Sequence, residues 1–158
     1  MAVVIKEGNV FDSDADIICH QVNCQGVMGS GVAKEVRERY PYVFREYKLE
    51  CDRAKDCPAK LLGKVQILAV DENDKTRWIV NCFGQEKYGY DGAQYTSVGA
   101  LTEAFQKVTT FVRNSSMSIA MPYKIGCCRG GANWDTVKKI IEDTFQGVDV
   151  ELWKLEGK

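Results

Sequence analysis

Residues 16–33, DIICHQVNCQGVMGSGVA, run from an apolar strand through a glycine-rich turn directly into a helix. The apolar run at 17–22 is typical of a strand buried on both faces. The turn Gly26-x-x-Gly29-x-Gly31 follows, and a 3.6-residue period beginning at Val32 predicts a helix that Pro41 ends. Unpaired backbone amides and the helix dipole favour an anion at such a helix N-terminus. The stretch therefore predicts a phosphate-binding loop.

A second glycine segment lies in residues 121–134, MPYKIGCCRGGANW. It also follows an apolar strand, and Asn133 is the expected N-cap of the helix after it. Ligands of open α/β sheets bind at the carboxyl ends of strands, where both turns would lie. Two such loops facing each other suit a pyrophosphate, although neither has the Walker pattern or the G-x-G-x-x-G order. For each turn taken alone, glycine supplying a left-handed turn conformation is an equally good explanation.

The rest of the chain alternates strands with helices and contains no linker or repeat. Residues 84–95 are rich in glycine and tyrosine and predict a functional loop, and residues 51–63 predict a surface loop. This pattern indicates one α/β domain, residues 1–158, with helices on both faces of a mixed sheet. The expected strands are 3–5, 17–22, 65–70, 78–83, 118–121 and 148–152, and the expected helices are 32–40, 42–50, 98–112 and the segment that Asn133 begins.

Composition excludes several classes of function. The formal net charge of −1 gives no global attraction to nucleic acid or to an anionic membrane. No apolar run is long enough to span a bilayer, and the first residues form a short strand rather than a secretory signal, so we expect no membrane partner. Seven cysteines without a pairing pattern indicate a reducing cytoplasm, and their spacing does not match a zinc site. We expect neither a metal nor a cofactor.

The two glycine segments resemble the two phosphate loops of macrodomains, and the order of elements resembles that family over nearly the whole chain. Within the family the chain is most similar to the branch of the yeast-type ADP-ribose-1″-phosphate phosphatases and the terminal ADP-ribose glycohydrolases. The resemblance implies a three-layer α/β/α fold with a central mixed sheet of about six strands. It also implies a hydrolase that binds ADP-ribose, with ADP-ribose-1″-phosphate as the favoured substrate. The alternatives are hydrolysis of ADP-ribosylated protein or nucleic acid, and an ADP-ribose-binding module without catalysis.

The resemblance assigns ligand contacts position by position. In the family an acidic residue after the first strand receives the adenine amino group, and here Asn9 and Val10 stand in that place, which is a departure. Trp153 matches an aromatic residue that stacks on adenine, and Asn23 matches the ribose-binding asparagine; a core tryptophan and a turn asparagine remain the alternatives. The expected phosphate loops consist of Gly29, Ser30, Gly31 and Val32 on one side and of Gly126, Cys127, Cys128, Arg129 and Gly130 on the other.

Two side chains are candidates for catalysis. His20 resembles a histidine of the yeast-type phosphatases and could transfer a proton, or it is a hydrogen-bonded core residue. Asp91 could activate water, or it belongs to a turn with Gly92. The terminal glycohydrolases use a lysine after the fourth strand and an aspartate in the second loop, where this chain has Phe83 and Gly130. Covalent lysine chemistry is disfavoured unless Lys87 reaches the site.

Overall fold

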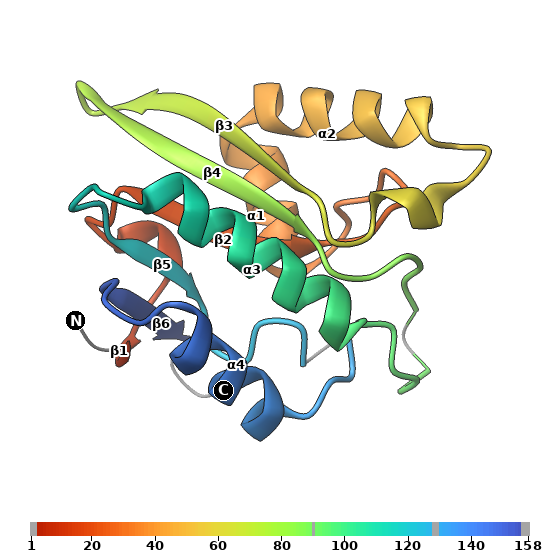
Figure 1. Cartoon of the computed structure of the whole chain (residues 1–158). Helices are drawn as coiled ribbons and strands as arrows, with labels where there is room; N and C mark the ends of the chain where they lie inside the picture. The colour runs from red at the N-terminus through yellow and green to blue at the C-terminus, as the bar shows by residue number, and fades with distance from the viewer. Residues whose placement is uncertain (1–2, 90, 128–129, 156–158) are drawn as a thin grey trace.

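The computed structural model describes residues 3–89, 91–127 and 130–155. A six-stranded sheet lies between two pairs of helices (Figure 1). The strands are β1 (Val3–Glu7), β2 (Ile17–Val22), β3 (Val65–Glu72), β4 (Lys75–Phe83), β5 (Ile119–Pro122) and β6 (Val150–Lys154). The helices are α1 (Gly31–Arg39), α2 (Pro41–Arg53), α3 (Val98–Val112) and α4 (Trp134–Thr144), with short 3₁₀ turns η1 (Val10–Asp12) and η2 (Pro58–Leu61).

The sheet order is β1-β6-β5-β2-β4-β3, and every neighbouring pair is parallel except β3 and β4. β3 and β4 form a hairpin whose two turn residues, Asn73 and Asp74, both have positive φ, which is the geometry of a type I′ turn. The mixed sheet with helices on both faces confirms the predicted α/β fold.

β2 lies in the middle of the sheet and divides the core. Ile17 and Cys19 pack on the side of α3 and α4, while Ile18 and Val22 pack on the side of α1 and α2. α3 and α4 lie on the near side of the sheet in Figure 1, and α1 is seen behind it. The buried apolar run that the sequence predicts therefore separates two hydrophobic clusters.

Some predicted boundaries were wrong. The predicted loop 51–63 contains the last turn of α2 and the 3₁₀ turn η2. β3 and β4 extend to their hairpin turn because charged residues at the exposed ends can still pair through their backbones. Among the described residues, no helix is both long and apolar enough to cross a bilayer.

The sheet order decides where the loops meet. β5, β2 and β4 are adjacent and parallel, so the segments that follow them leave the same edge of the sheet, toward the right of Figure 1. These segments are residues 23–30, 84–97 and 123–133, and they include both glycine segments and the predicted functional loop. We call them the first glycine loop, the middle loop and the second glycine loop.

Candidate ligand-binding site

The first glycine loop leads into α1, whose first amides have no side-chain cap. Ser30 is the N-cap residue, and its side chain makes no capping hydrogen bond within the described part of the chain. Gly31 has a φ of 60°, and a methyl group placed on it would meet no atom within 4 Å. At Gly29 the nearest atom to such a methyl group would be Cγ1 of Val27, at 3.5 Å. Side chains therefore leave open space around Gly29 and Gly31, and no Ser30 cap satisfies the first amides of α1, so this helix N-terminus is available to an anion.

The side chain of Asn23 holds the first glycine loop together through hydrogen bonds inside it. Its Nδ2 donates to the Val27 carbonyl (2.9 Å), and its Oδ1 accepts from the Gln25 amide (2.9 Å) and the Tyr47 hydroxyl (2.7 Å). The same hydroxyl of Tyr47, in α2, lies 2.8 Å from the Asn23 carbonyl, so its one proton is shared between the two oxygens of Asn23. The side chain is 9% exposed, so these bonds give Asn23 the turn-forming role that the sequence left as its alternative. Ribose binding by Asn23 stays a prediction.

The second glycine loop is more crowded. The Gly130 carbonyl accepts from the amides of Tyr95 (2.7 Å) and Thr96 (2.9 Å) in the middle loop. A methyl group on Gly130 would lie within 2.5 Å of the Gly126 carbonyl oxygen, so close packing by itself requires glycine at this position. The amide of Cys127 donates to the Lys124 carbonyl (2.9 Å) and is thus already paired. Cys128 and Arg129, both predicted ligand contacts, lie outside the described residues.

The two loops also differ in how their helices begin. Asn133 caps α4, because its Oδ1 accepts from the Thr136 amide at 3.1 Å, as the sequence predicts. α1 has no equivalent cap. Of the two helix N-termini, the start of α1 therefore has the greater need of an external anion.

The predicted adenine end lies where β1 and β6 end. Asn9 caps η1 through its Oδ1, which accepts from the Phe11 amide (2.9 Å), and its Nδ2 donates to the Glu35 carboxylate (3.0 Å). Val10 is buried and packs in the cluster on the side of α1 and α2. Trp153 is half-buried, and its ring limits the space at Gly8, where a methyl group would lie 3.1 Å from the indole. Asn9 and Trp153 thus border the same end of the sheet, and their adenine contacts stay predictions.

His20 is 1% exposed and belongs to a buried polar ladder. Asn81 donates to Gln66 through Nδ2 (3.0 Å), so its Oδ1 is the atom that accepts from His20 Nε2 at 2.6 Å. Nδ1 is buried and has no hydrogen-bond partner among the described residues. Burial lowers the pKa of His20 to about 4, against a smaller opposing effect of Asn81. In this geometry the imidazole is neutral at pH 7 and shielded from solvent, which matches the core-residue alternative; proton transfer by His20 stays a prediction.

Asp91 is exposed in the middle loop. It accepts from the Tyr95 hydroxyl (2.7 Å) and from the Ala93 amide (3.1 Å). The bond from Tyr95 is the main cause that lowers the pKa of Asp91 below its ordinary value. Two residues further along, Ala93 abuts the second glycine loop, since a methyl group on Gly131 would lie 2.8 Å from the Ala93 carbonyl oxygen. Asp91 is therefore an ionised carboxylate in the loop that contacts the second glycine loop, and no hydrogen bond joins it to His20 in the described structure.

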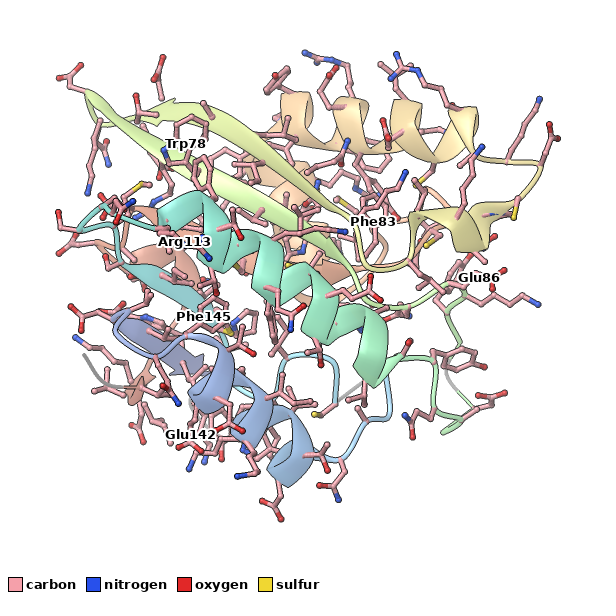
Figure 2. All side chains as sticks on the ribbon, in the orientation of Figure 1. Trp78, Phe83, Glu86, Arg113, Glu142 and Phe145 are labelled. Carbon is pink, nitrogen blue, oxygen red and sulfur yellow. The ribbon has the colours of Figure 1, made fainter. Side chains whose placement is uncertain are left out.

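Phe83, which stands where the terminal glycohydrolases are expected to have a lysine, is packed into the core. Phe83 is 1% exposed, and its ring stacks on Tyr47 with centroids 5.9 Å apart. Figure 2 labels Phe83 and Glu86 at this end of the sheet. Lys87 is exposed in the middle loop. Within residues 3–89, 91–127 and 130–155, no three histidine, cysteine, aspartate or glutamate side chains gather closely enough to hold a metal ion.

Sequence reasoning missed the side chains that hold the loops together. Gln21 donates through Nε2 to Gln85 Oε1 (2.6 Å) and to Thr96 Oγ1 (2.7 Å), and the Thr96 hydroxyl donates to the Gly126 carbonyl (2.7 Å). A glutamine within an apolar strand, next to a glycine loop, was a signal that could have identified Gln21. Nothing local distinguishes Gln85 or Thr96, because their partners lie far away in the sequence.

Comparison with known proteins supplies the family. The model of the Macro domain matches residues 19–141. The chain is 26% identical over 159 residues to a DNA ADP-ribosyl glycohydrolase of Mycobacterium tuberculosis, covering 98% of this chain but 43% of that protein. It is 27% identical over 94 residues to an ADP-ribose 1″-phosphate phosphatase of Meyerozyma guilliermondii, covering 58% of this chain and 51% of that protein.

The fold is similar to that of a solved structure. The macrodomain of Mycobacterium tuberculosis DarG superimposes with a TM-score of 0.81 at 23% identity, over 96% of this chain and 97% of that one. The chain spans less than half the length of the mycobacterial relative that it matches in sequence. Because the family model covers most of the chain, and because the fold agrees with that of a solved macrodomain, the chain belongs to the Macro domain family.

Proposed function

We propose that this protein binds ADP-ribose across the carboxyl ends of β2 and β5 and hydrolyses ADP-ribose 1″-phosphate. The observation that carries the proposal is the uncapped N-terminus of α1, which opens through Gly29 and Gly31 onto free space. A pyrophosphate is the part of ADP-ribose that such a site would hold, because backbone amides satisfy phosphate oxygens and the helix dipole favours their charge.

The neighbouring loops support a ligand with two phosphates. The backbone of the first glycine loop bonds to the middle loop through the Cys24 amide and the Glu86 carbonyl (3.0 Å). The middle loop bonds in turn to the second glycine loop at Gly130. The second glycine loop would therefore lie against the other side of the pyrophosphate. Gly126 and Gly130 set the shape of this loop, because side chains at these positions would meet neighbouring atoms.

Asp91 is our candidate for the proton transfer. In the proposed step, Asp91 accepts a proton from a water molecule whose oxygen attacks the phosphorus of the 1″-phosphate. The bond between that phosphorus and the ribose oxygen breaks, the ribose oxygen takes up a proton, and inorganic phosphate leaves. A carboxylate with a lowered pKa is ionised at neutral pH and can act as a base, although the lowering weakens its basicity.

A second candidate function is the removal of ADP-ribose from nucleic acid. The observation in its favour is the similarity over almost the whole chain to proteins named DNA ADP-ribosyl glycohydrolases. Phe83 and Gly130, both buried, occupy the places where that class is expected to have lysine and aspartate. This candidate would therefore require Lys87, or water activated by Asp91, in place of a lysine after β4.

The deciding experiment offers three substrates to the same protein. ADP-ribose 1″-phosphate, ADP-ribosylated DNA and mono-ADP-ribosylated protein are incubated side by side, and the products are resolved by chromatography. We expect release of phosphate from the first, and a loss of about a hundredfold in its rate in Asp91→Asn, which keeps the acceptor for Tyr95 but not the charge. Asp74→Asn, an exposed change at the far hairpin, is the control.

The other outcomes are equally informative. Release of ADP-ribose from DNA without release of phosphate would support the second candidate. If calorimetry detects binding of ADP-ribose and none of the substrates is hydrolysed, the protein is a binding module without catalysis. Absence of ADP-ribose binding would overturn the proposal.

A further inference from the structure

We infer that Gln21 is a positioning residue that sets the separation of the two glycine loops, and so selects a ligand with two linked phosphates. The inference rests on the proposed binding of ADP-ribose. Gln21 is the fifth of the six residues of β2, immediately before the strand ends, and it pairs in register with Cys82 of β4. It thus lies at the base of the sheet edge from which all three loops leave.

The amide nitrogen of Gln21 joins two ends of the middle loop. Nε2 donates to Oε1 of Gln85 at 2.6 Å, near the start of that loop, and to Oγ1 of Thr96 at 2.7 Å, near its end. Gln85 and Thr96 are 9% and 4% exposed, and their backbones form a β-bridge. One primary amide therefore closes the base of the middle loop in an environment from which water is excluded.

From Thr96 the network continues into the second glycine loop. Its hydroxyl accepts from Gln21 and so has its own proton free for the Gly126 carbonyl, at 2.7 Å. From Gln85 the network continues toward the first glycine loop, since the Gln85 carbonyl accepts from the Cys24 thiol at 3.4 Å and the next carbonyl accepts from the Cys24 amide. Figure 2 shows Glu86 beyond the end of β4, on the side where these loops lie.

Three glycines surround the amide group. A methyl group on Gly84 would lie 2.2 Å from Gln21 Oε1, one on Gly126 would lie 3.1 Å from the same oxygen, and one on Gly130 would lie 3.1 Å from Nε2. Gln21 Oε1 is buried and has no hydrogen-bond partner among the described residues. An unpaired buried acceptor destabilises a protein and so offsets part of the stability that the two bonds of Nε2 contribute. What these two bonds add beyond stability is that they fix the loops relative to each other.

The chemistry of the ligand follows from this arrangement. A ligand with a single phosphate can be bound by one glycine loop, whatever the position of the other glycine loop. A pyrophosphate has a fixed distance between its phosphorus atoms, so both loops can bind it only at one separation. Loss of the Gln21 bonds should therefore weaken the binding of ADP-ribose much more than the binding of AMP.

The test compares Gln21→Met and Thr96→Val, which keep side-chain size and remove the hydrogen bonds, and their double variant. Affinities for ADP-ribose are measured by calorimetry, and affinities for AMP by NMR titration into the millimolar range. We expect each single variant to weaken ADP-ribose binding about tenfold, with less than a twofold change for AMP. Both changes break one network, so their effects should not add. The double variant should have a Kd for ADP-ribose at most about twofold above that of the single variant with the lower affinity.

Thr109→Val is the matched control. Thr109 is a half-buried threonine of α3 whose hydroxyl donates to the Phe105 carbonyl of its own helix at 3.1 Å and lies 3.4 Å from the Thr144 carbonyl of α4, so it bonds to none of the three loops. Its ADP-ribose affinity should stay within twofold of the parent. The inference is overturned if Gln21→Met binds ADP-ribose as the parent does, if it loses AMP and ADP-ribose equally, or if Thr109→Val shows the same loss. A parent protein that binds no ADP-ribose would instead refute the proposed function, which separates the two failures.

Discussion

His20 carries the only imidazole of the chain, and its surroundings determine its chemistry. In β2 it is buried, bonded to Asn81, and has its pKa lowered to about 4, mainly by burial. A histidine whose pKa is lower in the folded chain than in the unfolded chain binds fewer protons when folded. The folded state therefore loses stability as the pH falls below the unfolded value of 6.5 toward the folded value.

This pKa shift makes the stability of the protein depend on pH. Between about pH 7 and about pH 5, we expect His20 alone to reduce the free energy of unfolding by about 2 kcal/mol. His20→Gln keeps a donor for Asn81 and does not titrate, so this part of the pH dependence should disappear. Urea denaturation of both proteins at the two pH values measures the difference. The same pH dependence in the variant would show that His20 is not buried as a neutral side chain.

Gly29 is the position at which the phosphate loop can be tested with least disturbance. A methyl group there would meet only Val27, at an ordinary contact distance, so Gly29→Ala should bind ADP-ribose within a few-fold of the parent. Gly29→Glu places a negative charge where we expect the pyrophosphate, and binding should become undetectable by calorimetry. Gly130→Glu is a poor test, because any side chain there would collide with the Gly126 backbone. Equal affinity in Gly29→Glu and the parent would remove the first glycine loop from the site.

Helix ends explain why the two glycine loops are not equivalent. α3 and α4 begin at Ser97 and Asn133, whose side chains accept from the amides of Ala100 and Thr136. α1 begins at Ser30 without such a bond. The sequence predicts the Asn133 cap, but it cannot distinguish a capped helix from an uncapped one at Ser30, because the side-chain rotamer is not a property of the residue type. α2 has no side-chain cap either, but it begins at Pro41, directly after α1, so α1 is the uncapped helix that follows a glycine loop.

Removing the two cap side chains should have unequal effects. Asn133→Ala removes a capping bond and should lower the free energy of unfolding by about 1 kcal/mol without changing ADP-ribose affinity. Ser30→Ala removes no capping bond and should change stability by less than about 0.5 kcal/mol. Thermal unfolding of both variants without ligand provides the comparison. A larger loss in Ser30→Ala than in Asn133→Ala would contradict the uncapped start of α1.

Across the whole molecule, the adjacency of β5, β2 and β4 brings together the three loops of the candidate site. The loops after these strands are separated in the sequence by the α1–α2 unit, the β3–β4 hairpin and α3, yet they meet at one edge of the sheet. The bonds from Cys24 to Glu86 and from Thr96 to Gly130 join all three. A ligand held by more than one of these loops binds the folded state alone.

Ligand binding should therefore stabilise the fold as a whole. At a free ADP-ribose concentration about one hundred times Kd, the free energy of unfolding should rise by about 2.7 kcal/mol. Denaturant unfolding with and without ADP-ribose measures this, and Gly29→Glu should show no increase under the same conditions. Equal stabilisation of Gly29→Glu would mean that the nucleotide binds elsewhere.

The amino-acid sequence alone was sufficient for the local features: the apolar run of β2, the periodicity of α3, the Asn133 cap and the two glycine segments. These follow from backbone preferences and burial patterns that extend over a few neighbouring residues. The boundaries within 51–63 were wrong, because apolar contacts of Cys51, Ala54 and Leu61 with distant elements decide where α2 ends and where η2 forms.

Only the tertiary structure decided the order of the strands, the closure of the middle loop by Gln21 and the pairing of His20 with Asn81. Each of these depends on which residues meet across the sheet, and pairing between distant strands leaves no periodic signal in either strand. The sequence therefore determined that two glycine turns follow apolar strands and precede helices, and the packing of the sheet determined that both turns contact the same middle loop.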